Sequence, residues 1–225
     1  MIPKKVHYCW FGNNPYPPLV KDCMKSWTKY LADFELKKWD ESNSPMDNIV
    51  VQKAIAMKKW AFASDYVRLY ALYHEGGVYL DTDMEILKDI AYLLNQKGFF
   101  GYEDEIHISA GIIGSQPRSE LIKLIMDKLE EKVKANLPFL PIPQIITEII
   151  RGLPENSLIV ENMSFYPPSY FYPYNPYANE RKELLFSDIV ENTYAIHHWS
   201  ASWIDEKPLW RIAGSRLKKH LVNKN

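Results

Sequence analysis

The chain has 225 residues, 47% of them hydrophobic, and a formal net charge of -1, so it can bury a substantial core and we expect a single domain over residues 1–225. The charge argues against a general nucleic-acid binder, which carries a strong basic excess. No apolar run reaches the ~18 residues of a membrane-spanning helix, and the N-terminus lacks the apolar segment of a signal peptide, so we expect a cytoplasmic protein.

The first 40 residues alternate between strand and helix patterns. Residues 6–11 are rich in β-forming residues, residues 19–30 have apolar side chains at helical spacing, and residues 34–39 indicate a second strand. Such alternation predicts an α/β fold, with a mostly parallel, doubly wound sheet flanked by helices. Because ligands bind beyond the carboxyl ends of such strands, Trp10, Phe11 and Gly12 are candidate contacts for a nucleotide base, although core packing explains Trp10 equally well.

The central part of the chain indicates a helix, a glycine break and a strand that ends in acidic residues. Residues 60–75 contain neither Gly nor Pro, and their apolar residues recur at steps of three and four. Gly76 and Gly77 end this helix, because glycine adopts the positive φ of a C-terminal cap without steric cost. The alternating residues that follow predict an extended strand with Asp81 and Asp83 on one face, about 7 Å apart.

Two carboxylates this close repel each other unless a cation or a proton relieves the repulsion. Mg²⁺ or Mn²⁺, held jointly by the carboxylates and by phosphates of a substrate, is the simplest solution. An EF-hand would require Gly and Glu at the positions where this chain has Ile86 and Tyr92. Two surface acids after a strand remain the alternative to a metal site.

Three polar residues of the predicted helix, Ser64, Asp65 and Arg68, lie on one face because they are three and four positions apart. A local ion pair between Asp65 and Arg68 would explain two of them. With the residues that follow they form the pattern Ser64-Asp65-x-x-Arg68-x-x-x-Leu72-x-x-x-Gly76-Gly77-x-Tyr79-x-Asp81-x-Asp83. In this pattern the chain resembles glycosyltransferase family 32, whose sugar-binding region contains an Asp-x-Asp motif, and the related bacterial glucosylating toxins.

The resemblance implies a GT-A-like, Rossmann-related fold and a nucleotide-sugar donor, with a UDP-hexose favoured. It implies that Asp81 and Asp83 bind the metal and that Arg68 and Asp65 hold hydroxyls of the donor sugar. The further donor contacts that it implies are Trp10, Phe11, Gly12, Ser64, Tyr79 and Thr82.

The elements expected next are a short helix at 90–94, a strand at 98–102, a strand and tight turn on the acceptor side at 106–115, and helices at 121–133 and 144–150. Glu103, Asp104 and Glu105 are expected either in a solvated loop or, for one of them, in contact with the acceptor. Residues 165–177 combine prolines with aromatic residues, which predicts an ordered loop beside the site without regular elements.

Residues 194–199 indicate a strand in which His197 and His198 point to opposite faces. The segment resembles the C-terminal His-x-x-x-x-Ser-Trp segment of the family. The resemblance implies that His197 is the third metal ligand, with His198 in reserve, and that Ser202 and Trp203 contact the donor phosphates. An imidazole ligand favours Mn²⁺ over Mg²⁺.

Residues 209–224 indicate a basic amphipathic helix. Such a helix either docks on anionic lipid at the inner face of the cell membrane or packs on its own domain. We favour peripheral membrane association, because enzymes that build polymers commonly use lipid-linked acceptors.

The function expected from these features is a metal-dependent, retaining hexosyltransferase that acts on a saccharide or lipid-linked acceptor in capsule or lipopolysaccharide synthesis. The metal would neutralise the diphosphate leaving group. The alternatives are a toxin-like enzyme that glycosylates proteins and a non-catalytic carbohydrate-binding module. Nucleotidyl transfer would normally add a glycine-rich phosphate loop, which the sequence does not contain.

Overall fold

The computed structural model describes residues 1–154, 157, 162–177 and 183–200. In chain order, its elements are β1 (Lys5–Cys9), α1 (Pro18–Tyr30), β2 (Glu35–Trp39), α2 (Ile49–Ala56), α3 (Trp60–Glu75), β3 (Gly77–Leu80), β4 (Met84–Ile86), η1 (Ala91–Leu94), β5 (Gly98–Tyr102), β6 (Ile108–Ser115), α4 (Glu120–Lys134), α5 (Ile142–Gly152), β7 (Ser164–Tyr166), α7 (Pro168–Phe171), η2 (Phe186–Asp188) and β8 (Ala195–His197). The predicted strand at 98–102 and helix at 60–75 have the expected bounds.

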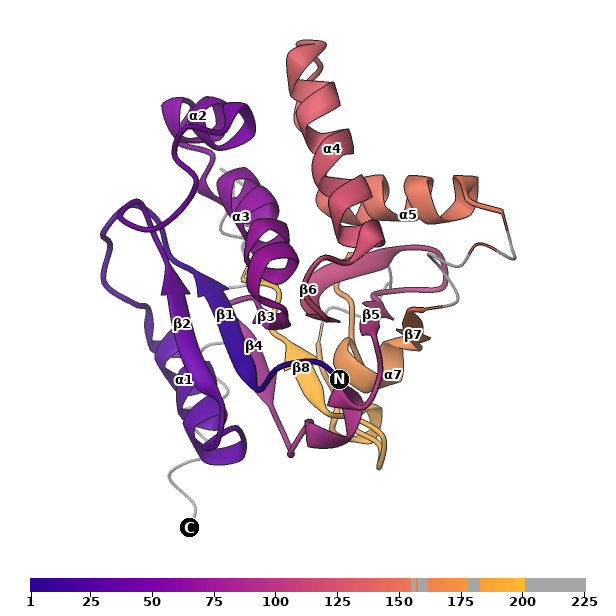
Figure 1. The fold of residues 1–225 in the computed structure, drawn as a ribbon. Coiled ribbons are helices and arrows are strands. Elements are labelled where there is room, and N and C mark those ends of the chain that lie inside the picture. The colour runs from indigo at the N-terminus through magenta and orange to yellow at the C-terminus, as the bar shows by residue number, and fades with distance from the viewer. Residues whose placement is uncertain (155–156, 158–161, 178–182, 201–225) are drawn as a thin grey trace.

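A six-stranded sheet in the order β2-β1-β3-β6-β5-β7 forms the centre of the molecule (Figure 1). β1 pairs in parallel with β2 and β3, and β5 pairs in parallel with β7, whereas β6 is antiparallel to its neighbours β3 and β5. The predicted mostly parallel α/β sheet is therefore confirmed. Because β6 alone runs in the opposite direction, its amino end lies at the same end of the sheet as the carboxyl ends of β1, β3 and β5.

Hydrophobic cores cover both faces of the sheet. One core packs α2, α3, α4 and α5 on the sheet. The other core contains α1, α7, η1 and the small antiparallel pair of β4 and β8. Trp27 joins α1 to this pair, since its buried indole N–H donates to the Met84 carbonyl oxygen at 2.7 Å. None of the described helices combines the length and the apolar character needed to cross a membrane.

The junction between α3 and β3 depends on two glycines. Gly76 has a φ of 64° and Gly77 a φ of 108°, both in the region that glycine tolerates best. A Cβ atom at Gly76 would lie 2.7 Å from Pro117, and one at Gly77 would lie 2.6 Å from the Lys5 carbonyl oxygen. The tight passage from α3 into the sheet therefore excludes any side chain at either position.

The strand after this junction is shorter than the sequence predicted. β3 ends at Leu80, the last residue paired with β6. The Met84 N–H donates to the Asp81 carbonyl oxygen at 2.9 Å, which closes a turn over residues 81–84. Asp81 and Asp83 therefore lie on a turn between β3 and β4, and the prediction of an extended strand through both acids was wrong.

Three other segments differ from the predictions. α2 was not predicted, although Asn48 caps it by accepting the Val50 N–H. Residues 165–177 contain the last two residues of β7 and all of α7, and α7 begins at Pro168, because proline suits the first turn of a helix. Residues 108–115 form one continuous strand, so the tight turn expected there is absent.

Candidate active site

Arg68 joins α3 to the acidic turn. It is 5% exposed, its Nη2 lies 2.8 Å from Asp65 Oδ1, and its Nη1 lies 3.3 Å from Asp81 Oδ1. Nη1 also donates to the Ala110 carbonyl oxygen at 2.7 Å, and the guanidinium lies 4.6 Å from the centre of the Tyr79 ring. The local pair with Asp65 is therefore present, but Arg68 also binds the adjoining ends of β3 and β6.

Asp81 is held by several neighbours. The Tyr79 hydroxyl donates to its Oδ1 at 3.0 Å, and its own N–H donates to the Gly111 carbonyl oxygen at 2.7 Å. A Cβ atom on Gly111 would lie 3.3 Å from Asp81 Oδ2, so glycine lets β6 pass close to the carboxylate. Burial raises the pKa of Asp81 above its ordinary value, and the charge of Arg68 opposes the rise.

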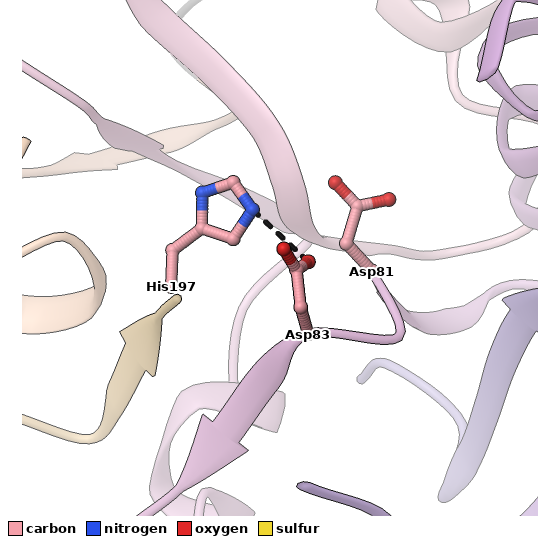
Figure 2. Close-up of side chains that lie close together, drawn as sticks. All are labelled: Asp81, Asp83 and His197. Atoms are coloured by element: carbon pink, nitrogen blue, oxygen red, sulfur yellow. Dashed lines mark hydrogen bonds and ion pairs between the residues drawn. The ribbon is translucent and has the colours of Figure 1, made fainter. Parts of the chain in front are cut away.

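Asp83 faces the C-terminal strand (Figure 2). His197 Nε2 lies 3.1 Å from Asp83 Oδ1, and the Ser200 N–H donates to Asp83 Oδ2 at 2.6 Å. Burial alone would raise the pKa of Asp83, but the nearby His197 and the bond from Ser200 hold it below its ordinary value. Burial alone would lower the pKa of His197, but Asp83 raises it. Asp83 and His197 therefore each stabilise the charged form of the other.

The side chains of Asp81, Asp83 and His197 fit a divalent cation (Figure 2). Each offers a ligand atom, and these atoms all lie within 4.8 Å of one another. His197 presents its Nε2 to this cluster, 3.1 Å from Asp83 Oδ1 (Figure 2). His198 lies outside this cluster, because its Nε2 contacts Glu85 Oε2 at 2.6 Å.

The predicted nucleotide contacts follow the carboxyl end of β1. Trp10 is partly exposed and packs edge-on against Tyr16 at 4.8 Å, whereas Phe11 is buried in the core. Gly12 has a φ of 86°, and a Cβ atom there would lie 3.4 Å from the ring of Trp60. The loop after β1 therefore lies against the first residue of α3.

The remaining predicted donor contacts are placed as follows. The Ser64 hydroxyl donates to the Trp60 carbonyl oxygen at 3.1 Å, within α3. Thr82 lies on the turn between the two acids. Ser202, Trp203 and the expected helix at 209–224 lie outside the described residues.

Glu103 is a further candidate for the site, because the sequence left open whether one of the acids at 103–105 contacts the acceptor. It directly follows the carboxyl end of β5, and its N–H donates to the His107 carbonyl oxygen at 2.9 Å. Its carboxylate lies close enough to the buried Ser109 and to His197 for both to act on its pKa. Burial raises the pKa of Glu103, and the nearby Ser109 and His197 oppose the rise. Glu103 is therefore half-buried on the loop after β5, at the end of the sheet that carries the metal cluster.

Residues 17–100 match a family described as the glycosyltransferase sugar-binding region containing the DXD motif. Lactosylceramide 4-alpha-galactosyltransferase from Pongo pygmaeus is 28% identical over 151 residues, which are 61% of this chain and 66% of that protein. Inositol phosphoceramide mannosyltransferase 2 from Schizosaccharomyces pombe is 27% identical over 150 residues, 63% of this chain and 43% of that protein. The match thus spans less than two thirds of the length of either relative, and the predicted resemblance to Asp-x-Asp glycosyltransferases is confirmed.

Two solved structures share the fold. The PaToxG glycosyltransferase has a TM-score of 0.56 at 19% identity, covering 71% of this chain and 73% of that chain. The galactosyltransferase LgtC, in complex with donor and acceptor sugar analogs, has a TM-score of 0.52 at 13% identity, covering 96% of this chain and 94% of that chain. These likenesses confirm the predicted GT-A-like fold class.

Proposed function

We propose that this relative of the Asp-x-Asp glycosyltransferases itself transfers a hexose from a nucleotide sugar, with a UDP-hexose favoured, to a saccharide or lipid-linked acceptor. The observation that carries the proposal is the convergence of Asp81, Asp83 and His197 within 4.8 Å, next to the buried Arg68. The relatives are named as a galactosyl- and a mannosyltransferase, which supports a hexose. Their names also specify ceramide lipids, which supports a lipid-linked acceptor.

Asp81, Asp83 and His197 would hold a divalent cation, and the imidazole favours Mn²⁺ over Mg²⁺. The bound cation supplies Lewis-acid neutralisation of the diphosphate leaving group. Arg68 is already fixed by Asp65 and Asp81, so little side-chain freedom is lost when it binds hydroxyls of the donor sugar.

The resemblance to the family supports transfer with retention of configuration, and the contacts of the acidic side chains bear only on the route of a retaining reaction. Asp65 and Asp81 bind Arg68, and Asp83 binds His197, so none of these three is poised as a free nucleophile. We therefore favour attack by the acceptor on the face that the leaving phosphate occupies. Glu103 directly follows β5 and forms no ion pair with another described residue, and it is the acid that we assign to an acceptor hydroxyl.

We further propose a cytoplasmic role in the synthesis of a surface polysaccharide, with the acceptor carried on a membrane lipid. A protein that glycosylates proteins would instead modify a polypeptide acceptor, and a binding module would leave the donor intact.

The test is release of nucleoside diphosphate from a panel of nucleotide sugars, with and without Mn²⁺. We expect metal-dependent release from at least one donor, and Asp83→Asn should lower it by about a hundredfold or more, because one anionic ligand is lost. Asp127→Asn changes an exposed acid on α4 in the same way and should leave release unchanged. Full activity of Asp83→Asn with unchanged metal dependence would contradict the assignment, and binding of saccharides without any release would identify a binding module.

A further inference from the structure

Apolar side chains project where the end of α2 meets the connection between α4 and α5. Met57 is 50% exposed, Leu137 is 48% exposed and Leu140 is 36% exposed. Phe62 and Phe139 stack with their ring centres 4.8 Å apart, and both line one small cavity together with Leu137 and Leu140. We call these five residues the apolar tip. Exposed apolar side chains gathered in this way are typical of surfaces that bind another molecule.

Three lysines surround the apolar tip. Lys53 Nζ lies 5.9 Å from the centre of the Phe139 ring, and Lys59 Nζ lies 5.6 Å from that of Phe62. Lys58, between Met57 and Lys59, is exposed. Lys53 donates to the neutral Asn136 Oδ1 at 3.1 Å, and within the described part of the chain none of the three lysines forms an ion pair.

The neighbouring lysines of α4 are different. Lys132 lies 3.5 Å from Glu148 and Lys134 lies 3.2 Å from Glu130, so acidic side chains already offset their charges. The positive charge without an acidic partner is therefore concentrated on the α2 side of the apolar tip. A partner that is apolar in its interior and anionic at its surface would complement both features.

The apolar tip adjoins the candidate active site. Phe62 precedes Asp65 by one helical turn of α3, and Asp65 lines the same small cavity as Phe62 and Leu140. α3 begins at Trp60, which lies against the loop after the carboxyl end of β1. A surface bound to the apolar tip would therefore lie next to the end of the sheet that carries the candidate active site.

We propose that the apolar tip and Lys53, Lys58 and Lys59 dock the protein on an anionic lipid bilayer. The apolar side chains enter the boundary between headgroups and acyl chains, and the lysines contact lipid phosphates. None of these residues belongs to the basic segment at 209–224. The inference deepens the proposed function, because it brings the site to a lipid-linked acceptor, but the docking itself is measured without any donor.

The experiment is flotation of the full chain with vesicles of phosphatidylcholine alone or mixed with phosphatidylglycerol. We expect binding to the anionic vesicles that weakens as salt is added. Leu137→Ser with Leu140→Ser, and separately Lys58→Glu with Lys59→Glu, should each lower the ratio of bound to free protein by roughly tenfold or more. All four side chains are exposed, so thermal unfolding should show that the variants remain folded.

Matched controls lie on other surfaces. Tyr92→Ser removes a side chain that is 75% exposed on η1, near the amino end of β1, and Lys21→Glu with Lys25→Glu reverses two exposed charges on α1. Both controls should bind anionic vesicles almost as well as the unaltered chain, apart from a small general charge effect.

Three results would overturn the docking proposal. The full chain could fail to bind anionic vesicles, or the apolar-tip variants could bind as tightly as the unaltered chain, which would assign docking to another segment. The serine variant could also change only the oligomeric state, which would identify the apolar tip as a protein interface. Nucleotide release from a soluble donor, measured without vesicles, should be the same in all variants. If the unaltered chain released no nucleotide from any donor, the proposed function would be contradicted, but the docking result would still hold.

Discussion

Asp81 and Asp83 are two positions apart, yet the fold gives them different partners. Asp81 binds Arg68 and Tyr79, whereas Asp83 binds His197 and the Ser200 N–H. Burial acts on both carboxylates, and the difference in partners moves their pKa values in opposite directions. Asp83 is therefore the more firmly ionised acid of the pair, and the one whose charge the protein has already balanced with an imidazole.

Glu103→Gln tests the acceptor role at the scale of a single residue. The glutamine keeps the shape of the side chain but removes its negative charge. We therefore expect the rate of sugar transfer to the acceptor to fall by about ten- to hundredfold, and the rate of donor hydrolysis by water to change less. The measurement compares saccharide transfer with donor hydrolysis, using the saccharide on which the unaltered chain proves most active.

Glu105→Gln is the matched control, because Glu105 is exposed on the same turn. It should leave both rates unchanged. Equal losses of transfer and hydrolysis in Glu103→Gln would show that this residue supports the whole site and does not select the acceptor.

The environment of His7 predicts how the free energy of unfolding depends on pH. It is fully buried, its Nδ1 accepts the Trp39 indole N–H at 3.0 Å, and its Nε2 lies 2.7 Å from the Gly76 carbonyl oxygen, so the ring is neutral with its proton on Nε2. Burial lowers the pKa of His7 below its ordinary 6.5. Since the unfolded chain then binds the proton more tightly, the free energy of unfolding should fall as the pH drops below 6.5, by at most about 1.4 kcal/mol per pH unit.

The check is urea unfolding between pH 8 and pH 5 for the unaltered chain and for His7→Gln. The glutamine cannot take up a proton, so the variant should lose part of this pH dependence. The same slope in both proteins would mean that His7 is not the group responsible.

At the scale of elements, the junction between α3 and β3 sets the position of the site. Gly76→Ala and Gly77→Ala should each lower the free energy of unfolding by about 2 kcal/mol or more, because both positions combine positive φ with close backbone neighbours. For a chain of this size such a loss lowers the Tm by about 4 °C or more.

Gly152→Ala provides the control for this prediction. Gly152 ends α5, and a Cβ atom there would meet nothing within 4 Å. Its Tm in a thermal scan should equal that of the unaltered chain or exceed it. Similar losses at all three glycines would indicate a general intolerance to substitution and refute the special role of the junction.

The same elements show what the sequence could predict. α3 was predicted residue by residue, because its apolar period is long and two glycines mark its end. The strand through Asp81 and Asp83 was wrong, since an alternation of a few residues occurs in turns as well, and pairing with β6 decides where β3 ends. α2 was missed because eight residues contain too few helical turns to show a clear period.

Some residues of the candidate active site could likewise be predicted from the sequence, and others could not. Asp65, Arg68 and Asp83 lie within one local pattern, so their spacing was visible in the sequence. No local signal in the sequence predicts that Ser109, Ala110 and Ser200 lie at the site, because only the order and pairing of the strands bring them there. Glu103 could have been found from its position directly after a predicted strand.

At the scale of the whole molecule, ligand binding should be coupled to global stability. Mn²⁺ together with UDP should raise the Tm of the unaltered chain, since a ligand that binds only the folded state adds about 2.7 kcal/mol at a hundred times its Kd. His197→Ala should abolish most of this rise. The measurement is a thermal scan, so it requires no acceptor and no turnover.

His198→Ala is the matched control for the metal assignment. His198 contacts Glu85 and lies outside the ligand cluster, so its variant should keep the rise in Tm. The reverse pattern, with the rise lost only in His198→Ala, would move the third ligand to His198.

The pairing of β4 with β8 has a consequence for biosynthesis. His197 and Ser200 bind Asp83 across 114 and 117 positions of the chain. A polypeptide still emerging from the ribosome can assemble most of the central sheet before either residue has been translated, because domains begin to fold from their N-terminal part. The cluster of Asp81, Asp83 and His197 can therefore form only after residue 197 has been translated, when the strands of the central sheet are already available to fold.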